Sequence, residues 1–315
     1  MRWVPSLSVV VPATDAPATL DECIRAIEAA VDSPGELIVV DTPRGVGPAA
    51  ARNAGARRSS GDVIVFVDSD VAVHPDAFAR IQAAFAIDPT LTALFGSYDD
   101  EPRAGGVVSD FRNLLHHYVH QTAAGPATTF WAGLGAIRRD AFVASGGFDE
   151  RSFPQPSIED IDLGMRIVDR GGRIVLDPLL QGKHLKRWTL AGMIDTDFAA
   201  RGVPWVTLLL RRGSGSTALN LGWRHRATAA ASLALVTALA RKRLPLSAGL
   251  LVLIITLNQS FYRLLLRQRG AGVAAAGLPL HVIHHLVGVA ALPAGARRHL
   301  LARRSPRSSA GERRS

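Results

Sequence analysis

Short apolar runs alternate with segments of helical periodicity along the first half of the chain. Four runs are rich in Val, Ile and Leu at successive positions, which is typical of strands buried on both sides of a sheet. These predicted strands are Leu7–Val11, Glu36–Val40, Val63–Val67 and Leu91–Phe95. Between them, apolar residues recur at helical spacing, as at Leu20, Cys23, Ile24 and Ile27. The pattern predicts an α/β fold, with a mostly parallel sheet and helices on both faces.

The alternation is less regular from residue 100 to 190. The pattern there predicts a helix over Val107–Gln121, a strand over Thr128–Ala132, a helix opening at Glu159 and a strand over Arg173–Leu176. At the start of the chain, Pro12 and Asp15 interrupt the first apolar run too early for a signal peptide, so we expect a buried strand there.

Beyond residue 200 the pattern changes to three uncharged runs of 14, 19 and 26 residues, at Ala227–Ala240, Leu244–Tyr262 and Ala271–Ala296. A membrane-spanning helix needs about 20 mainly apolar residues, so the middle run fits best. The first run is short, and the third contains histidines and prolines, which suits a helix lying in the interface. We expect a globular domain over 1–200, a membrane-associated helical region over 201–300 and a basic disordered tail over 301–315.

The distribution of charged residues supports this division of the chain into domains. The 315 residues carry a formal charge of +9, but residues 1–200 hold 18 basic and 26 acidic side chains, whereas 201–315 hold 18 basic side chains and the single acid Glu312. Basic residues bracket apolar runs with few aromatics between them, which favours an anionic membrane surface over nucleic acid as the partner. The single cysteine, Cys23, excludes a disulfide scaffold.

Acidic residues follow two of the predicted strands. In α/β sheets ligands bind beyond the carboxyl ends of the strands, where Asp41, Asp68 and Asp70 stand. Asp68 and Asp70 have the spacing to hold Mg²⁺ or Mn²⁺, which prefers oxygen ligands and leaves positions open for phosphate. A polar turn is the alternative for this pair. Asp41 suits a hydrogen bond to a nucleoside, or a turn cap, and Arg52 suits a diphosphate contact, or a surface helix position.

Two further positions suit the same chemistry. Glu159 and Asp160 open a predicted helix, whose positive end favours an ionised general base. Ordinary helix-start acids are the alternative. His184, after the last predicted strand, suits a third Mn²⁺ ligand or a surface position. No carboxylate or cysteine completes a zinc set with the histidines near 116–120 or 281–285, so we interpret these as amphipathic or interfacial faces.

Taken together, these pieces resemble the inverting family 2 glycosyltransferases with a GT-A fold. The resemblance covers about residues 5–190. In chain order it is carried by the segments Val9–Pro12, Asp41, Gly47–Gly55, Val67–Asp70, Gly146–Glu150 and Glu159–Arg166. Ala13-Thr14-Asp15 departs from the aromatic and Asn that usually follow the first-strand motif. Membrane-bound processive synthases carry a Gln-x-x-Arg-Trp motif. The corresponding segment here runs from His184 to Arg187 and Trp188, with His in place of Gln.

The resemblance implies transfer of a sugar from a nucleotide-diphosphate donor. By that similarity Pro12, Thr14 and Asp41 contact the nucleoside, and Asp68 contacts the ribose or the metal. The same similarity makes Asp70 and His184 metal ligands and Asp160 the base that deprotonates the acceptor. The synthase motif offers a second interpretation, in which Arg187 contacts the diphosphate and Trp188 the acceptor.

We therefore predict metal-dependent sugar transfer to a hydroxyl of a lipid-linked or glycan acceptor, at the cytoplasmic face of the cell membrane. Aromatic rings pack on the apolar face of sugars, so Trp131 and Gly133 are predicted on the acceptor side, with core packing as the alternative. A nucleotidyltransferase and a membrane-tethered nucleotide-sugar-binding module without turnover are the two alternative functions.

Overall fold

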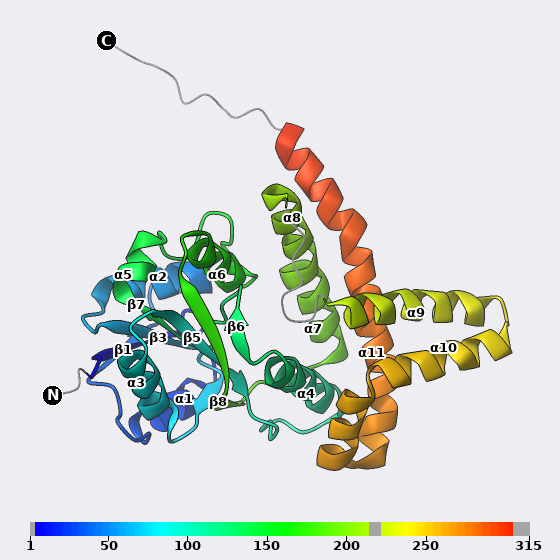
Figure 1. Ribbon diagram of the computed structural model, residues 1–315, viewed down its shortest axis with the longest axis horizontal. Helices are drawn as coiled ribbons and strands as arrows, with labels where there is room; N and C mark the ends of the chain where they lie inside the picture. The colour runs from blue at the N-terminus through cyan, green and yellow to red at the C-terminus, as the bar shows by residue number, and fades with distance from the viewer. Residues whose placement is uncertain (1–3, 214–221, 305–315) are drawn as a thin grey trace, which may run out of the picture.

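The computed structural model describes residues 4–213 and 222–304. An eight-stranded mixed sheet in the order β2-β1-β3-β7-β5-β8-β4, with β6 paired to β8, forms the centre of residues 4–184 (Figure 1). The strands are β1 Leu7–Pro12, β2 Glu36–Val40, β3 Val63–Val67, β4 Val71–Val73, β5 Leu91–Tyr98, β6 Gly125–Ala127, β7 Leu134–Arg138 and β8 Arg173–His184. The α/β fold class predicted from the pattern is confirmed.

Parallel pairing joins β1 to β2, β1 to β3 and β5 to β8. Strand β7 is antiparallel to both β3 and β5, and β8 is antiparallel to β4 and β6. The predicted strand over Thr128–Ala132 is wrong. This segment bends between β6 and β7, because Gly133 and Gly135 pack so closely on Trp131 and Phe130 that the chain turns there.

Helices cover both faces of the sheet. On one face, Cys23 and Ile27 of α1 and Phe78 and Phe85 of α3 pack on β1, β3 and β5. On the other face, α2, α5 and α6 pack on the alternate side chains of the same strands, such as Phe66. The helices are α1 Leu20–Glu28, α2 Pro48–Arg58, α3 Ala77–Ile87, α4 Val107–Thr122, α5 Arg139–Ala144 and α6 Glu159–Asp169. Successive side chains of a strand point to opposite faces, and helices cover both faces, so the central strands are buried and mainly apolar at every position.

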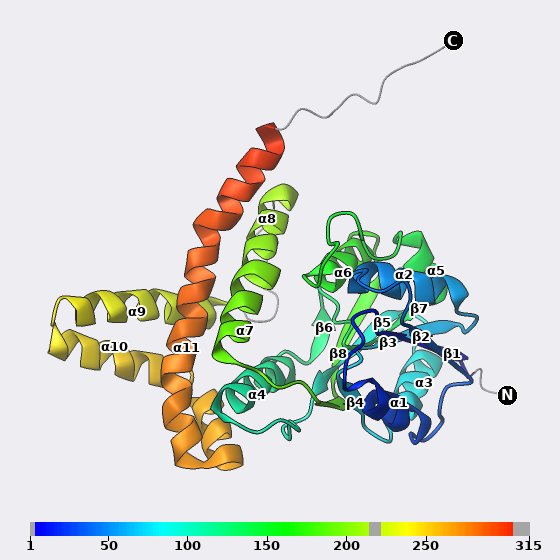
Figure 2. The same ribbon diagram turned by 180° about the vertical axis from the view of Figure 1, so that it is seen from behind.

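The rest of the described chain is helical. It consists of α7 Leu190–Asp195, the π-helix η1 Thr196–Gly202, α8 Val203–Arg212, α9 Trp223–Ala240, α10 Leu244–Leu257 and α11 Gln259–Arg304. Helix α11 lies along α8 and reaches α4, while α9 and α10 form a hairpin that projects away from the sheet (Figure 2). A shared core of α4 and α11, including Phe111, Leu114, Phe261 and Leu265, joins these helices to the α/β part.

The middle uncharged run does not form the long helix that its sequence predicts. Helix α10 ends at Leu257, and the next helix begins at Gln259. Gly270, at φ +81°, then interrupts α11 in a conformation that favours glycine. The helix that is long and apolar enough to cross a membrane lies in Gln259–Arg303 instead, with 28% of its most apolar window buried. Of the predicted basic tail, residues 305–315 lie outside the described residues, and α11 extends to Arg304.

Candidate active site

Strand ends bring the predicted acids to one edge of the sheet. Val40, at the end of β2, pairs with Pro12 of β1, and β1 pairs in turn with β3, so Asp41 and Asp68 both lie beyond the carboxyl ends of parallel strands. Asp41 is exposed, and Pro12 is buried within β1. The hydroxyl of Thr14 donates to the carbonyl of Val46 at 2.6 Å, which holds the loop before α2 against the end of β1.

Arg52 of α2 links two acids that are far apart in the sequence. Its Nη2 lies 2.6 Å from Asp68 Oδ1 and its Nη1 lies 2.8 Å from Glu159 Oε1, and its side chain is only 5% exposed. Burial opposes the charge of Arg52, but the charges of Asp68 and Glu159 outweigh burial and raise its pKa above the ordinary value. Both terminal nitrogens are engaged by carboxylates, so the diphosphate contact expected for Arg52 stays a prediction. The observed bridge fixes the distance between the strand end and α6.

Glu159 and Asp160, adjacent in sequence, have different environments. Glu159 is buried, pairs with Arg52 and accepts from the backbone N–H of Ser157. Asp160 is partly exposed and accepts from the backbone N–H groups of Ala132 and Ile161. Burial, together with the negative charge of Glu159, raises the pKa of Asp160 to about 6. Among residues 4–213 and 222–304 this carboxylate has no ion-pair partner. A carboxylate with such a pKa and such surroundings suits a general base, whereas Glu159 suits a positioning role.

His184 lies beside Asp70. The pairing of β4 with β8 places Val71 opposite His184, and the backbone N–H of Leu185 donates to Asp70 O at 2.8 Å. His184 Nε2 lies 3.4 Å from Asp70 Oδ2, while His184 Nδ1 is hydrogen bonded to the amide oxygen of Asn113. Because an amide oxygen only accepts, Nδ1 donates, and the Nε2 lone pair of a neutral ring then faces the carboxylate. A cation between these two groups would stabilise that arrangement.

The residues present therefore fit a divalent cation whose remaining coordination positions are filled by the substrate. Burial opposes ionisation of Asp70, but when the His184 ring is protonated, its Nε2–H and its charge, together with the charge of Lys186, outweigh burial and lower the pKa of Asp70. Among residues 4–213 and 222–304, no three His, Cys, Asp or Glu side chains converge to hold a metal by themselves. Mg²⁺ and Mn²⁺ commonly take one or two protein ligands and fill the remaining positions with phosphate oxygens and water.

The predicted acceptor residues occupy two places. Trp131 packs over Gly133, where a Cβ would lie 2.3 Å from the indole ring, and Asp68 N donates to Gly133 O at 3.0 Å. Trp131 is therefore next to both Asp68 and the segment that holds Asp160. Trp188 lies apart from it, 6.3 Å from the His184 ring, between Arg112 and the ammonium of Lys186.

Several residues near the site escaped the sequence analysis. Tyr98 stacks on His184, with ring centroids 4.1 Å apart, and contacts Trp131 and His116. His116 and His120 contact Trp131, so part of the histidine helix belongs to the site region rather than to an amphipathic surface. The aromatic spacing of α4 was visible in the sequence, but its contact with Trp131 depends on tertiary packing. Asn53 joins two motifs, because its amide bonds both backbone groups of Phe148.

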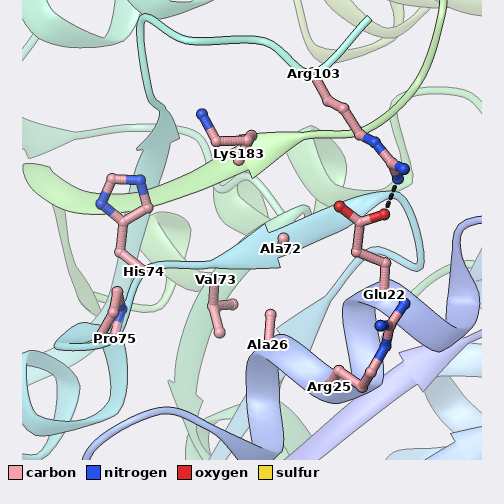
Figure 3. A pocket seen from close by; sticks show the side chains of 9 residues that line it. All are labelled: Glu22, Arg25, Ala26, Ala72, Val73, His74, Pro75, Arg103 and Lys183. Carbon is pink, nitrogen blue, oxygen red and sulfur yellow. Dashed lines mark ion pairs between the residues drawn. The ribbon is translucent and has the colours of Figure 1, made fainter.

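A cavity of about 610 Å³ lies beside β4 and α1, away from this group of acids (Figure 3). Most of its charged groups are paired with acids, Arg103 with Glu22 and Lys183 and His74 with Asp99, and Arg25 donates to the backbone carbonyl of Asp21. Matched charges of this kind stabilise the sheet edge and leave little for an anionic ligand. The acids at the strand ends, rather than this cavity, are therefore the candidate site.

Part of the α/β region matches a known protein family. Residues 21–144 match the model of Glycosyl transferase family 2. The chain is 28% identical over 165 residues to the pre-mycofactocin glycosyltransferase of Mycobacterium tuberculosis, covering 50% of this chain and 34% of that protein. It is 35% identical over 78 residues to an uncharacterized glycosyltransferase of Haemophilus influenzae, covering 25% and 31%. The chain thus spans about a third of the length of these relatives.

Among solved structures, the mannosyltransferase PcManGT from Pyrobaculum calidifontis, in complex with GDP-Man and Mn²⁺, is similar in fold. The TM-score is 0.53 at 19% sequence identity, and the match covers 95% of this chain and 88% of that chain. The family match and the similarity in fold agree: residues 21–144 lie in a domain that matches Glycosyl transferase family 2, on a mixed α/β sheet like that of GT-A structures.

Proposed function

We propose that the protein transfers a sugar, with inversion, from a nucleotide-diphosphate donor to an acceptor hydroxyl at a membrane face. The observation that carries the proposal is the Arg52 bridge, which holds Asp68 of the strand end and Glu159 of α6 together with distances of 2.6 and 2.8 Å. It brings the acids predicted for the donor and for the base into one site, from positions 91 residues apart in the sequence. The similar mannosyltransferase binds GDP-Man and Mn²⁺, which supports a nucleotide sugar and a divalent cation here.

On the donor side, Pro12, Thr14 and Asp41 border the nucleoside. Asp68, Asp70 and His184 would hold the divalent cation, which when bound would neutralise the diphosphate leaving group. These side chains orient the anomeric carbon toward the acceptor. The loop at Pro154 contacts Gly47 so closely that a Cβ there would lie 2.2 Å from Pro154 O. This contact covers the helix α2 start and helps exclude water from the donor.

On the acceptor side, Asp160 takes the proton of the attacking hydroxyl as its oxygen bonds to the anomeric carbon and the diphosphate leaves from the opposite face. Backbone donation from Ala132 and Ile161 fixes the carboxylate in place. Trp131, adjacent to Ala132, offers its indole to the acceptor sugar or to the donor sugar. Glu159 holds the helix start through Arg52 and keeps Asp160 oriented.

The helices of residues 201–300 form the membrane-associated part of this proposal. Helix α10 is uncharged and exposes Leu246, Val252, Leu253 and Ile255. Arg241, Lys242 and Arg243 connect it to α9. Exposed apolar helices flanked by basic residues are typical of elements that bind an anionic bilayer surface. The domain of residues 1–200 would then work on the cytoplasmic side, where nucleotide sugars are available.

A screen of nucleotide sugars against the purified protein tests this function. With Mn²⁺ present, at least one donor should raise the melting temperature, and the nucleoside diphosphate should be released in the presence of acceptor. Release of pyrophosphate from a nucleoside triphosphate would indicate a nucleotidyltransferase and contradict the proposal. Donor binding without turnover on any acceptor in a glycan and glycolipid panel would indicate a binding module instead.

A further inference from the structure

Helix α4 holds both ends of the segment from His184 to Trp188. Ser109 and Asn113 are four positions apart and therefore lie on one face of this helix. The hydroxyl of Ser109 accepts from the backbone N–H of Trp188 at 2.8 Å and donates to the Trp188 carbonyl at 3.4 Å. At the other end of the segment, the amide oxygen of Asn113 is hydrogen bonded to His184 Nδ1. The position of the His184 ring therefore depends on a helix that carries none of the family motifs.

The main chain around His184 is held by the sheet edge and not by α4. The carbonyl of His184 accepts from the backbone N–H of Arg103 at 3.1 Å, and the backbone N–H of Leu185 donates to Asp70 O at 2.8 Å. These bonds place the Cβ atom of His184 beside Asp70. They leave the rotation of the imidazole ring, and with it the direction of Nε2, to be decided by side-chain contacts.

Tyr98 fixes the plane of the ring but not its direction. Tyr98 of β5 pairs with Gly182 of β8, and His184 stands two residues further along β8, on the same face. The two rings stack with centroids 4.1 Å apart and planes 17° from parallel. A half-turn about the Cβ–Cγ bond would leave the His184 ring in that plane, and would exchange Nε2 with Cε1 next to Asp70. Stacking fits both orientations, so a polar contact has to select one of them.

Asn113 makes that polar contact. Its side chain is 1% exposed and His184 is 2% exposed, so their hydrogen bond is shielded from bulk water. Among residues 4–213 and 222–304, the buried Nδ2 of Asn113 has no hydrogen-bond partner, so this side chain is fixed through its oxygen. The half-turn of the His184 ring would leave that oxygen without a donor, at a cost that buried polar groups rarely bear. The bond therefore keeps Nδ1 toward α4 and Nε2 toward Asp70, at 3.4 Å from its Oδ2.

We propose that Asn113 is a positioning residue for cation binding, whose amide oxygen holds His184 in the Nδ1–H tautomer with the Nε2 lone pair beside Asp70. The inference rests on the proposed function, because the cation belongs to the donor site. It also separates the two interpretations of the segment, since it makes the His184 ring a ligand while Arg187 remains exposed. Hydrogen bonds that orient a metal-bound histidine typically contribute about 10–100-fold to metal affinity.

Titration of the purified protein with Mn²⁺ alone, followed by the EPR signal of free Mn²⁺, measures cation binding directly. Asn113→Leu has a similar volume but no acceptor, so it should weaken Mn²⁺ binding at least about tenfold. Asn113→Asp keeps an acceptor oxygen at the same place, so it should retain or increase the affinity of the unmodified protein. Gln121→Leu is the control, because it removes another amide of α4, one that donates to Pro178 O. It should change the affinity less than about twofold.

The tautomer of His184 is a second readout, one that a role of Asn113 in general packing would not change. In nitrogen-15 NMR spectra of histidine-labelled protein at alkaline pH, without metal or donor, the protonated and unprotonated nitrogens of a neutral ring give separate signals. His184→Leu identifies the His184 signals by their loss. These signals should show a protonated Nδ1 in the unmodified protein and in Asn113→Asp, and a mixture of the two tautomers in Asn113→Leu.

Three results would overturn the inference. The first is a Mn²⁺ affinity of Asn113→Leu within about twofold of the unmodified protein, with circular dichroism unchanged. The second is binding in Asn113→Asp as weak as in His184→Leu, which would show that the acceptor oxygen is not what matters. The third is an unmodified protein that binds no Mn²⁺ or carries His184 with Nε2 protonated, and this result decides the case even where Asn113→Leu does not fold. No donor is present in these measurements, so failure of the donor screen leaves them readable, and sugar transfer without a metal would contradict this inference alone.

Discussion

The α/β part buries its large apolar side chains, whereas the C-terminal helices expose many of theirs. Up to residue 184, large apolar residues fill two cores, one on each face of the sheet, and the exposed ones are scattered. On α9 and α10, exposed apolar residues adjoin one another, as at Leu233, Val236, Val252 and Ile255. Neighbouring exposed apolar side chains on a folded protein mark a surface that contacts a partner or a membrane. The proposed function accordingly gives the chemistry to the first part and bilayer contact to the second.

The largest effect is expected at the proposed base, in the first part. Asp160→Asn keeps an oxygen for the Ala132 N–H but cannot accept a proton, so turnover should fall by about 10²–10⁴-fold. Donor binding measured by titration should stay within about twofold, because Asp160 does not hold the diphosphate. Asp169→Asn, at an exposed position of the same helix, is the control. Turnover of Asp160→Asn within a few fold of the unmodified protein would remove the base assignment.

The next effect concerns the stability of the α/β part. Arg52→Met leaves the buried Glu159 and the partly exposed Asp68 without their cation, so the free energy of unfolding should fall by about 2–4 kcal/mol. Urea unfolding measures this loss, and Arg58→Gln, on the exposed side of α2, should cost less than about 0.5 kcal/mol. Adding Glu159→Gln to Arg52→Met should restore part of the stability. No recovery in the double variant would show that the Arg52–Glu159 pair is not the cause.

Membrane binding should depend on the second part alone. Replacing Val252 and Ile255 of α10 by Asp introduces two charges at positions that are 62% and 41% exposed, so folding is unaffected but bilayer contact is opposed. Co-sedimentation with anionic vesicles should fall about tenfold, while turnover on a soluble acceptor stays the same. Ile87→Asp, at an exposed position of α3, should leave vesicle binding unchanged. An equal loss of vesicle binding in both variants would contradict the assignment of membrane binding to the second part.

The smallest effect is a shift in pH dependence. Asp160 acts as a base only when ionised, so turnover should rise with pH through about 6 and level off above it. Burial is the main cause of the raised pKa and the charge of Glu159 the second. Glu159→Gln removes that charge, so the acidic limb should move to lower pH by about half a unit to one unit. A limb that stays in place or moves upward, measured from kcat/KM, would show that another group controls it.

Much of the fold was predictable from local pattern. Glu36–Val40 and Val63–Val67 are strands with the predicted bounds, because apolar residues at successive positions leave few alternatives for a short buried segment. The conformation of residues 128–132 was not predictable from the pattern, since close packing of Gly133 and Gly135 on Trp131 and Phe130 decides it. The uncharged run 244–262 looked continuous, but hydropathy does not encode the break at Asn258.

For the site, contacts between residues far apart in the sequence could not be predicted. Asp68 and Asp70 stand out because they follow a strand, and their neighbourhood with His184 followed from the resemblance. The contact of Arg52 with Glu159 spans 107 residues, and that of His184 with Asn113 spans 71, so only the folded chain reveals them.

The hydrogen bond from Asp68 to Gly133 has a consequence for sequence variation among relatives. It adds to the antiparallel register in which Val67 pairs with Leu134, so one peptide group couples the end of β3 to the turn that carries Trp131. An inserted or deleted residue between Phe130 and Leu134 would slide that coupling by one position and turn the indole to the other side of the sheet. Length changes should therefore accumulate in the exposed segment around Gly105 and be rare between Phe130 and Leu134.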